Sequence, residues 1–241
     1  AIDSLVTQNV TMGKKVEQFE QMFADYLGVK HAIMANSGSS ANLLMMSVAS
    51  NPAYGGRLMP GDEVIVPALT WSTTIWPVIQ NHLHPVLVDC DPDTLCIDVD
   101  KIEITERTKA ICVAHILGNG CDMDALVELA DKHRLILLED NCESLGTKYK
   151  GRQLGTFGAM GTFSFFFSHH ITTIEGGMVV TDNDRTADLL RCLRAHGWTR
   201  HMHDRSIEKR FDIDPRFMFA NIGYSVRPTE IQGAFGIHQL P

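Results

Sequence analysis

The stretch that decides the fold is residues 63–140, in which four short apolar runs are separated by more polar segments. The runs are EVIVPAL (63–69), PVLVDC (85–90), KAICVAHI (109–116) and RLILLED (134–140). Each run is almost continuously apolar, which is typical of a strand buried on both faces. Segments of helix length at 72–82 and 123–133 lie between the runs. Alternating strands and helices predict an α/β fold with a mostly parallel central sheet flanked by helices.

The segments on either side of this stretch continue the pattern. Near the N-terminus, apolar residues recur at helical spacing and Gly28 follows as a helix stop. We predict further helices at 13–28, 36–49, 184–197 and 231–240, further strands at 31–35, 161–167 and 176–182, and a long loop at 199–220.

Composition and charge narrow the class of protein. The chain has 241 residues, of which 44% are hydrophobic and 21% charged, and its formal net charge is −8. This balance is typical of a globular domain and does not provide the basic surface that binds nucleic acid or anionic membranes. No apolar run reaches the roughly 18 to 20 residues that span a bilayer. We therefore expect a cytoplasmic protein with no nucleic-acid or membrane partner.

The cysteines and the two ends of the chain lead to two further expectations. The six cysteines include no CxxC pair and most lie in apolar runs, so we expect buried free thiols. The sequence begins without methionine and stops inside the helical pattern at 231–240. We expect residues 1–241 to form one large domain of a longer protein, without its small C-terminal domain.

Three segments carry residues suited to chemistry. Asn36-Ser37-Gly38-Ser39-Ser40 lies between a predicted strand and helix, where backbone N–H groups bind phosphate, although small polar residues also make ordinary helix caps. Glu139 and Asp140 end an apolar strand, at the sheet edge where α/β proteins bind ligands; a helix cap is the alternative. His169 and His170 follow Ser164 in the third segment. They are either catalytic or one core and one surface residue, and no metal-ligand spacing accompanies them.

Taken in order, these segments resemble the DegT/StrS family of sugar-nucleotide aminotransferases. The segments that carry the resemblance are TMGKKVEQFEQMFADYLGVKHAIMANSGSSA, GDEVIVPALTW, LVDCDPDT, LLEDNCESLGTKYKGRQLGTFG, FSFFFSHHITTIEGGMVVTD, LRAHGW and GYSVRPTEIQGAFGIHQL. The resemblance implies the type I fold of pyridoxal-phosphate enzymes, which is the fold of aspartate aminotransferase. It also implies a homodimer with the active site at the interface.

The resemblance assigns cofactor-binding roles to residues of this sequence. Gly38, Ser39 and Ser164 match residues that bind the cofactor phosphate, and Trp71 matches the aromatic residue that stacks on the pyridine ring. Asp140 matches the carboxylate that pairs with the ring nitrogen. Two further positions depart from the family pattern: Glu143 occupies the place of a glutamine near the ring's phenolic oxygen, and Ser225 that of an asparagine which contacts the phosphate of a neighbouring subunit.

The most informative departure is His169, at the position where aminotransferases of this family carry the Schiff-base lysine. No lysine occurs between Lys150 and Lys209, so a shifted alignment does not restore one. An imidazole forms no stable Schiff base, but it titrates near neutral pH and moves protons. The resemblance then implies pyridoxal 5′-phosphate or pyridoxamine 5′-phosphate held non-covalently. It also implies a dehydratase that removes the C3 hydroxyl of a nucleotide-linked 4-keto-6-deoxyhexose, with His169 as the catalytic residue.

Two kinds of dehydratase share this histidine. One regenerates its amine from L-glutamate, and the other receives electrons through a [2Fe–2S] cluster, as in the CDP-4-keto-6-deoxyglucose 3-dehydrases. A cluster needs four thiolates. Cys142 matches one cluster ligand, but the loop before Lys209 contains no cysteine. We therefore expect the glutamate-dependent kind, of the type used in lipopolysaccharide biosynthesis, with the cluster enzyme and a non-catalytic relative as alternatives.

Overall fold

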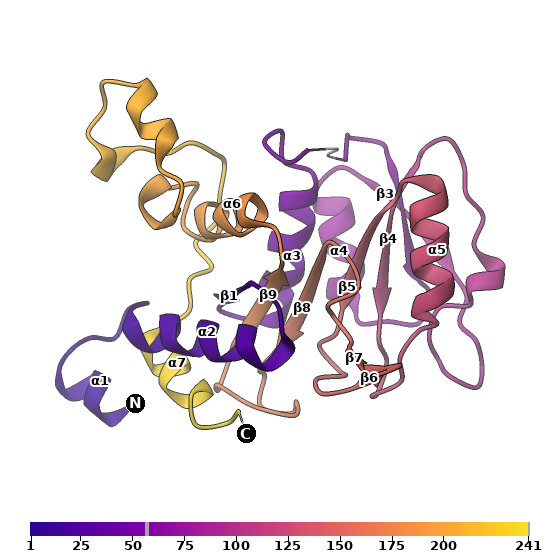
Figure 1. Ribbon diagram of the computed structural model, residues 1–241, viewed down its shortest axis with the longest axis horizontal. Coiled ribbons are helices and arrows are strands. Elements are labelled where there is room, and N and C mark those ends of the chain that lie inside the picture. The colour runs from indigo at the N-terminus through magenta and orange to yellow at the C-terminus, as the bar shows by residue number, and fades with distance from the viewer. Residues whose placement is uncertain (56–57, 241) are drawn as a thin grey trace.

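The computed structural model describes residues 1–55 and 58–240. Within them, a seven-stranded sheet lies between layers of helices (Figure 1). The strand order is β1-β9-β8-β5-β4-β2-β3. The strands are β1 (His31–Ala35), β2 (Glu63–Pro67), β3 (His84–Val88), β4 (Thr108–Ala114), β5 (Ile136–Asp140), β8 (Met160–Ser164) and β9 (Gly177–Thr181).

The direction of the strands follows the predicted class. Neighbouring strands are parallel except where β9 pairs with β1 and β8, to both of which it is antiparallel. The α/β class and the mostly parallel sheet are therefore confirmed. The strand predicted at 161–167 was too long, because β8 ends at Ser164 and the chain then turns. In this turn the His169 N–H donates to the Phe166 carbonyl at 3.0 Å.

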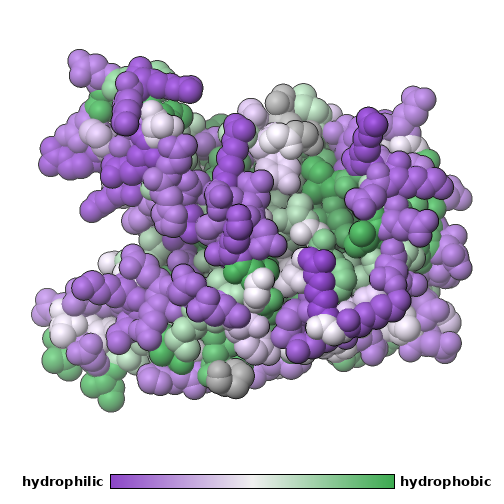
Figure 2. Space-filling model, in the orientation of Figure 1, coloured by the Kyte–Doolittle hydropathy of each residue, from purple (hydrophilic) through white to green (hydrophobic). Residues whose placement is uncertain are grey.

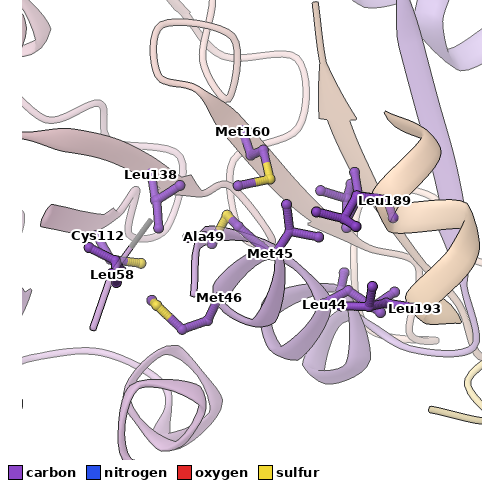
Figure 3. Packing of buried hydrophobic residues seen from close by; sticks show 14 of the residues in the cluster. Leu44, Met45, Met46, Ala49, Leu58, Cys112, Leu138, Met160, Leu189 and Leu193 are labelled. Atoms are coloured by element: carbon purple, nitrogen blue, oxygen red, sulfur yellow. The ribbon is translucent and has the colours of Figure 1, made fainter. Parts of the chain in front are cut away.

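Helices cover both faces of the sheet. On one face, α2 (Lys14–Leu27) and α5 (Met123–His133) pack on the strands. On the other, α3 (Gly38–Ala49), α4 (Ser72–Gln80) and α6 (Asp184–Arg194) do so. Figure 3 shows the centre of this second layer, where methionine and leucine side chains of α3 meet Leu138, Met160 and the leucines of α6. This packing holds α3 against the sheet.

The remaining elements are short. They are the helices α1 (Ile2–Val6) and α7 (Glu230–Gly236), the 3₁₀ turn η1 (Val99–Lys101), and the hairpin of β6 (Lys148–Tyr149) and β7 (Arg152–Gln153). The sequence did not predict the hairpin. The segment predicted as a loop at 199–220 contains three further 3₁₀ turns, η2 (Thr199–His201), η3 (Ser206–Arg210) and η4 (Pro215–Phe217). This segment projects from the body in Figure 1, and Figure 2 shows a notch between it and α2.

The cysteines agree with the expectation of free thiols, and four of the six are buried. Cys90 and Cys142 are only partly buried, so the expectation of burial was too broad. None of the helices that the structure describes is both long and apolar enough to cross a membrane.

Candidate active site

A cavity of about 400 Å³ lies at the carboxyl ends of β5 and β8, beside the first turns of α3 and α4. This is the sheet edge at which open α/β folds bind ligands. Seven of the eight predicted site residues line it, namely Gly38, Ser39, Trp71, Asp140, Glu143, Ser164 and His169. Segments that are far apart in the sequence therefore meet at one place, as the resemblance implied.

The first turn of α3 forms one wall of the cavity. Ser37 caps the helix, its Oγ accepting the Ser40 N–H at 3.1 Å. The N–H groups of Gly38 and Ser39 have no intrahelical acceptor, as at any helix start. Gly38 lies so close to β8 that an added Cβ would be 2.5 Å from the Ser164 Cβ. Two backbone donors and the Ser164 hydroxyl are thus brought together in a geometry suited to a phosphate group.

Asp140 forms the polar floor of the cavity. The residue is only 6% exposed. Its Oδ2 accepts hydrogen bonds from Asn42 Nδ2 and Thr74 Oγ1, both at 2.7 Å, and its Oδ1 accepts the Cys142 N–H at 3.2 Å. A buried carboxylate is stabilised when such donors surround it.

Asn42 and Thr74 also line the cavity, and the sequence reasoning missed both. A faint signal was present for Asn42, since it is the one amide in the otherwise apolar or small helical stretch 41–49. Thr74 offered no comparable signal, because Ser72 and Thr73 beside it are also hydroxyl residues.

Adjacent acidic residues, which the sequence left as joint candidates, have different environments. Successive side chains of a strand point to opposite faces, so Asp140 points toward α3 while Glu139 lies beneath the other face. The fully buried Glu139 accepts the N–H groups of Gly155 and Gly158 at 2.8 and 2.6 Å. His115 Nε2 lies 3.2 Å from its carboxylate. Glu139 therefore has a structural role, and Asp140 is the carboxylate available to a ligand.

Trp71 stands at the edge of the cavity, immediately before α4. Its side chain is 69% exposed, which is unusual for an indole ring and leaves one face open to a flat ligand. Near Trp71, the first turns of α3 and α4 are joined by a hydrogen bond, in which the Ser39 hydroxyl donates to Thr73 Oγ1 at 3.2 Å.

His169 follows β8 and reaches the same cavity from the turn. Its ring packs edge-on against Phe166, with the ring centroids 6.4 Å apart. Partial burial lowers the pKa of His169 below its ordinary value of 6.5, and the negative charge of Glu143 opposes this effect. The imidazole is therefore neutral at pH 7 and able to accept a proton. His170 is exposed and does not line the cavity.

Glu143 is held in place by one backbone bond. Its Oε2 accepts the Leu117 N–H at 3.1 Å, which fixes one carboxylate oxygen at the wall of the cavity. Together with Asp140 and Glu175 it makes the lining acidic, and none of the described lining residues is a lysine or an arginine.

Cys142 is the one cysteine among the described lining residues. Burial, and the negative charge of Asp140 beside it, raise the pKa of its thiol, so it stays protonated at neutral pH. No group of three or more histidine, cysteine or acidic side chains suited to a metal ion occurs within residues 1–55 and 58–240.

Ser225 is the predicted site residue that lies outside the cavity. Its side chain is exposed, its backbone forms a β-bridge with Ala195, and its hydroxyl accepts a bond from Arg227 at 3.4 Å. A contact of Ser225 with a neighbouring subunit stays a prediction.

Comparison with known proteins identifies the family. The model of the DegT/DnrJ/EryC1/StrS aminotransferase family matches residues 1–241. The chain belongs to this family. It is 48% identical to the GDP-4-keto-6-deoxy-D-mannose 3-dehydratase of Yersinia pseudotuberculosis, over 100% of the chain and 63% of that protein.

Two solved structures extend the comparison. The Escherichia coli GDP-4-keto-6-deoxy-D-mannose-3-dehydratase with bound hydrated PLP superposes with a TM-score of 0.90 at 43% identity, covering 98% of this chain and 62% of that one. A structure of GDP-4-keto-6-deoxymannose-3-dehydratase with a trapped PLP-glutamate geminal diamine also gives a TM-score of 0.90, at 43% identity over 98% of this chain and 63% of that one. The type I fold is therefore confirmed. The chain spans less than two thirds of the length of these relatives.

Proposed function

We propose that this chain is the large domain of a pyridoxal-phosphate-dependent 3-dehydratase that acts on a nucleotide-linked 4-keto-6-deoxyhexose. The observation that carries the proposal is the position of His169. It lines the cavity that also holds Asp140 and Ser164, and no lysine is among the described lining residues. The relatives named 3-dehydratase, at 48% and 44% identity, support the same reaction.

The residues of the cavity fit the cofactor. The N–H groups of Gly38 and Ser39, with the Ser39 and Ser164 hydroxyls, would hold its phosphate, and the exposed Trp71 ring would stack on its pyridine ring. The buried Asp140 would hold the protonated ring nitrogen. When bound, pyridoxamine phosphate supplies an amine and an electron-accepting ring. Binding is non-covalent in this proposal, because His169 stands in the place of the Schiff-base lysine.

His169 moves the protons of the proposed reaction. Because burial lowers the pKa of His169, its imidazole is unprotonated at neutral pH and would accept the proton that the cofactor's C4′ carbon gives up. The resulting imidazolium would then give a proton to the C3 hydroxyl, which leaves as water. Glu143 lines the same cavity and stabilises the imidazolium while it holds that proton. Trp71 limits access of water by covering one side of the cavity.

The amine donor in this proposal is L-glutamate. The cluster-dependent alternative needs four thiolates, whereas Cys142 is the one cysteine in the described lining and the segment 199–220 contains none. The relative that has been solved with a PLP-glutamate adduct uses the same fold and supports this choice. A non-catalytic relative would not need to keep Asp140, Ser164 and a proton-accepting histidine in one cavity.

We further propose that the enzyme works as a homodimer. The phosphate of the cofactor, the diphosphate of a nucleotide sugar and both carboxylates of glutamate are anionic, yet the described lining is acidic and offers no lysine or arginine. Cationic groups from outside this cavity must therefore complete the site. A second subunit is one source, and in this proposal the exposed Ser225 would contact it.

The proposal is tested with the purified protein, pyridoxal phosphate and glutamate. Glutamate should shift the absorbance of the bound cofactor from the pyridoxal to the pyridoxamine form, and a panel of nucleotide-linked 4-keto-6-deoxyhexoses should identify the one that loses its C3 oxygen. His169→Asn should bind the cofactor without deoxygenation, whereas His169→Lys should become reducible by borohydride. Absence of cofactor binding, or full activity of His169→Asn, contradicts the proposal.

A further inference from the structure

Asn42 and Thr74 converge on one oxygen of Asp140 from two different helices. Asn42 Nδ2 and Thr74 Oγ1 each lie 2.7 Å from Asp140 Oδ2. Both residues are almost fully buried, at 3% and 2% exposure. Hydrogen bonds of this kind to a charged group are stronger than those between neutral groups.

Two more hydroxyl groups fix the direction of these bonds. Thr162 Oγ1 donates to Asn42 Oδ1 at 2.5 Å, so the Asn42 amide must turn its NH₂ group toward Asp140. Thr70 Oγ1 donates to Thr74 Oγ1 at 2.9 Å, so the single hydroxyl proton of Thr74 remains for Asp140. Both chains of donors end at the same carboxylate oxygen.

This arrangement favours one orientation of the Asp140 carboxylate. An ionised carboxylate oxygen accepts two hydrogen bonds, whereas a protonated Oδ2 would itself be a donor facing two donors. The other oxygen, Oδ1, accepts the Cys142 N–H at 3.2 Å and keeps a further acceptor site. Oδ2 is therefore occupied by two donors, and Oδ1 is the oxygen that can accept a donor from the cavity.

We propose that Asn42 and Thr74 are positioning residues, which orient the Asp140 carboxylate so that Oδ1 accepts a protonated heteroaromatic nitrogen. This inference rests on the proposed function, because that function supplies the pyridinium group. It adds two residues to the site. It attributes the ring-nitrogen interaction to Asp140 together with the buried Asn42 and Thr74, which are held in turn by the buried Thr162 and the partly buried Thr70.

The test compares Thr74→Val, which keeps the shape of the side chain, with Thr74→Ser, which keeps the hydroxyl. Equilibrium titration with pyridoxamine phosphate should show binding to Thr74→Val weakened by about tenfold or more, the effect of one hydrogen bond to a charged group. The pH at which the absorbance of the bound cofactor titrates should also fall, because its protonated ring nitrogen loses stabilisation. Thr74→Ser should restore both quantities.

Two further variants separate positioning from stability. Asn42→Ala should reproduce both effects, which guards against a folding defect of Thr74→Val alone. Thr94→Val is the matched control, because it removes a comparable bond, from Thr94 Oγ1 to Asp91 at 3.0 Å, in an exposed turn away from the cavity. A purely structural role would lower the melting temperature and leave the pH of the absorbance change unaltered.

The possible failures are distinguishable. If the wild-type protein binds no pyridoxamine phosphate, the proposed function is refuted and the inference falls with it. If the wild-type protein binds and both Thr74→Val and Asn42→Ala titrate at the wild-type pH with wild-type affinity, the inference alone is overturned.

Discussion

Replacing Gly38 by alanine should both destabilise the protein and weaken cofactor binding. The added Cβ would lie 2.5 Å from the Ser164 Cβ, 2.7 Å from its Oγ and 3.2 Å from its Cα. Carbon atoms pack best at about 3.5 to 4.0 Å, so the overlap is about 1 Å. Because β8 is central in the sheet and Ser164 is buried, relief requires α3 to move. Overpacking of this kind destabilises by about 1 to 3 kcal/mol.

Chemical denaturation and thermal melting measure the effect of Gly38→Ala, with a melting temperature lowered by about 2 to 4 °C per kcal/mol for a chain of this size. Displacement of α3 also moves the N–H groups of Gly38 and Ser39, so affinity for pyridoxamine phosphate should fall. Gly55→Ala is the control, since a Cβ there meets no atom within 4 Å. The double variant Gly38→Ala/Ser164→Gly should recover part of the lost stability through coupling of the two sites. Wild-type stability and affinity of Gly38→Ala would refute the steric argument.

Three further predictions concern single charges. In Glu143→Gln, the pKa of His169 should fall further because the opposing negative charge is gone. The acidic limb of the pH profile of kcat/KM should therefore move to lower pH. A shift of this limb to higher pH would contradict the prediction. Arg194→Met should destabilise by about 3 to 5 kcal/mol in urea unfolding, because the largely buried Glu20, 2.6 Å from Arg194 Nη1, loses its paired cation and keeps only the Met34 N–H as a donor. Glu139→Gln should destabilise by about 1.5 to 3 kcal/mol in urea unfolding, because the buried carboxylate accepts two backbone N–H groups. An unchanged unfolding midpoint of Arg194→Met or of Glu139→Gln would contradict the prediction for that variant.

Strongly periodic segments were predictable from the sequence, whereas short apolar runs were less so. The helix predicted at 123–133 is α5 with the same bounds, because its apolar positions face one side and Asp122 caps it. The run at 161–167 looked like one strand, yet Phe165 is buried while Phe167 is 71% exposed. An apolar run alone does not show where pairing ends, because pairing depends on the neighbouring strand.

The candidate site was predictable where a residue's role follows from its place at a strand or helix end. Asp140 and Gly38 were found in this way. Asn42 and Thr74 were not found, because each acts through a contact with Asp140, which lies 98 residues from Asn42 and 66 residues from Thr74 in the sequence. The insertion of antiparallel β9 between β1 and β8 is equally non-local.

The sequence by itself determined the chemical identity of the key group: a histidine, with no lysine between Lys150 and Lys209. That identity is covalent and does not depend on folding. Only the tertiary structure decided that His169 shares a cavity with Asp140 and that burial lowers the pKa of His169 while Glu143 opposes the change. The physical reason is that burial and electrostatic potential at a side chain are set by neighbours from other segments, which only folding brings together.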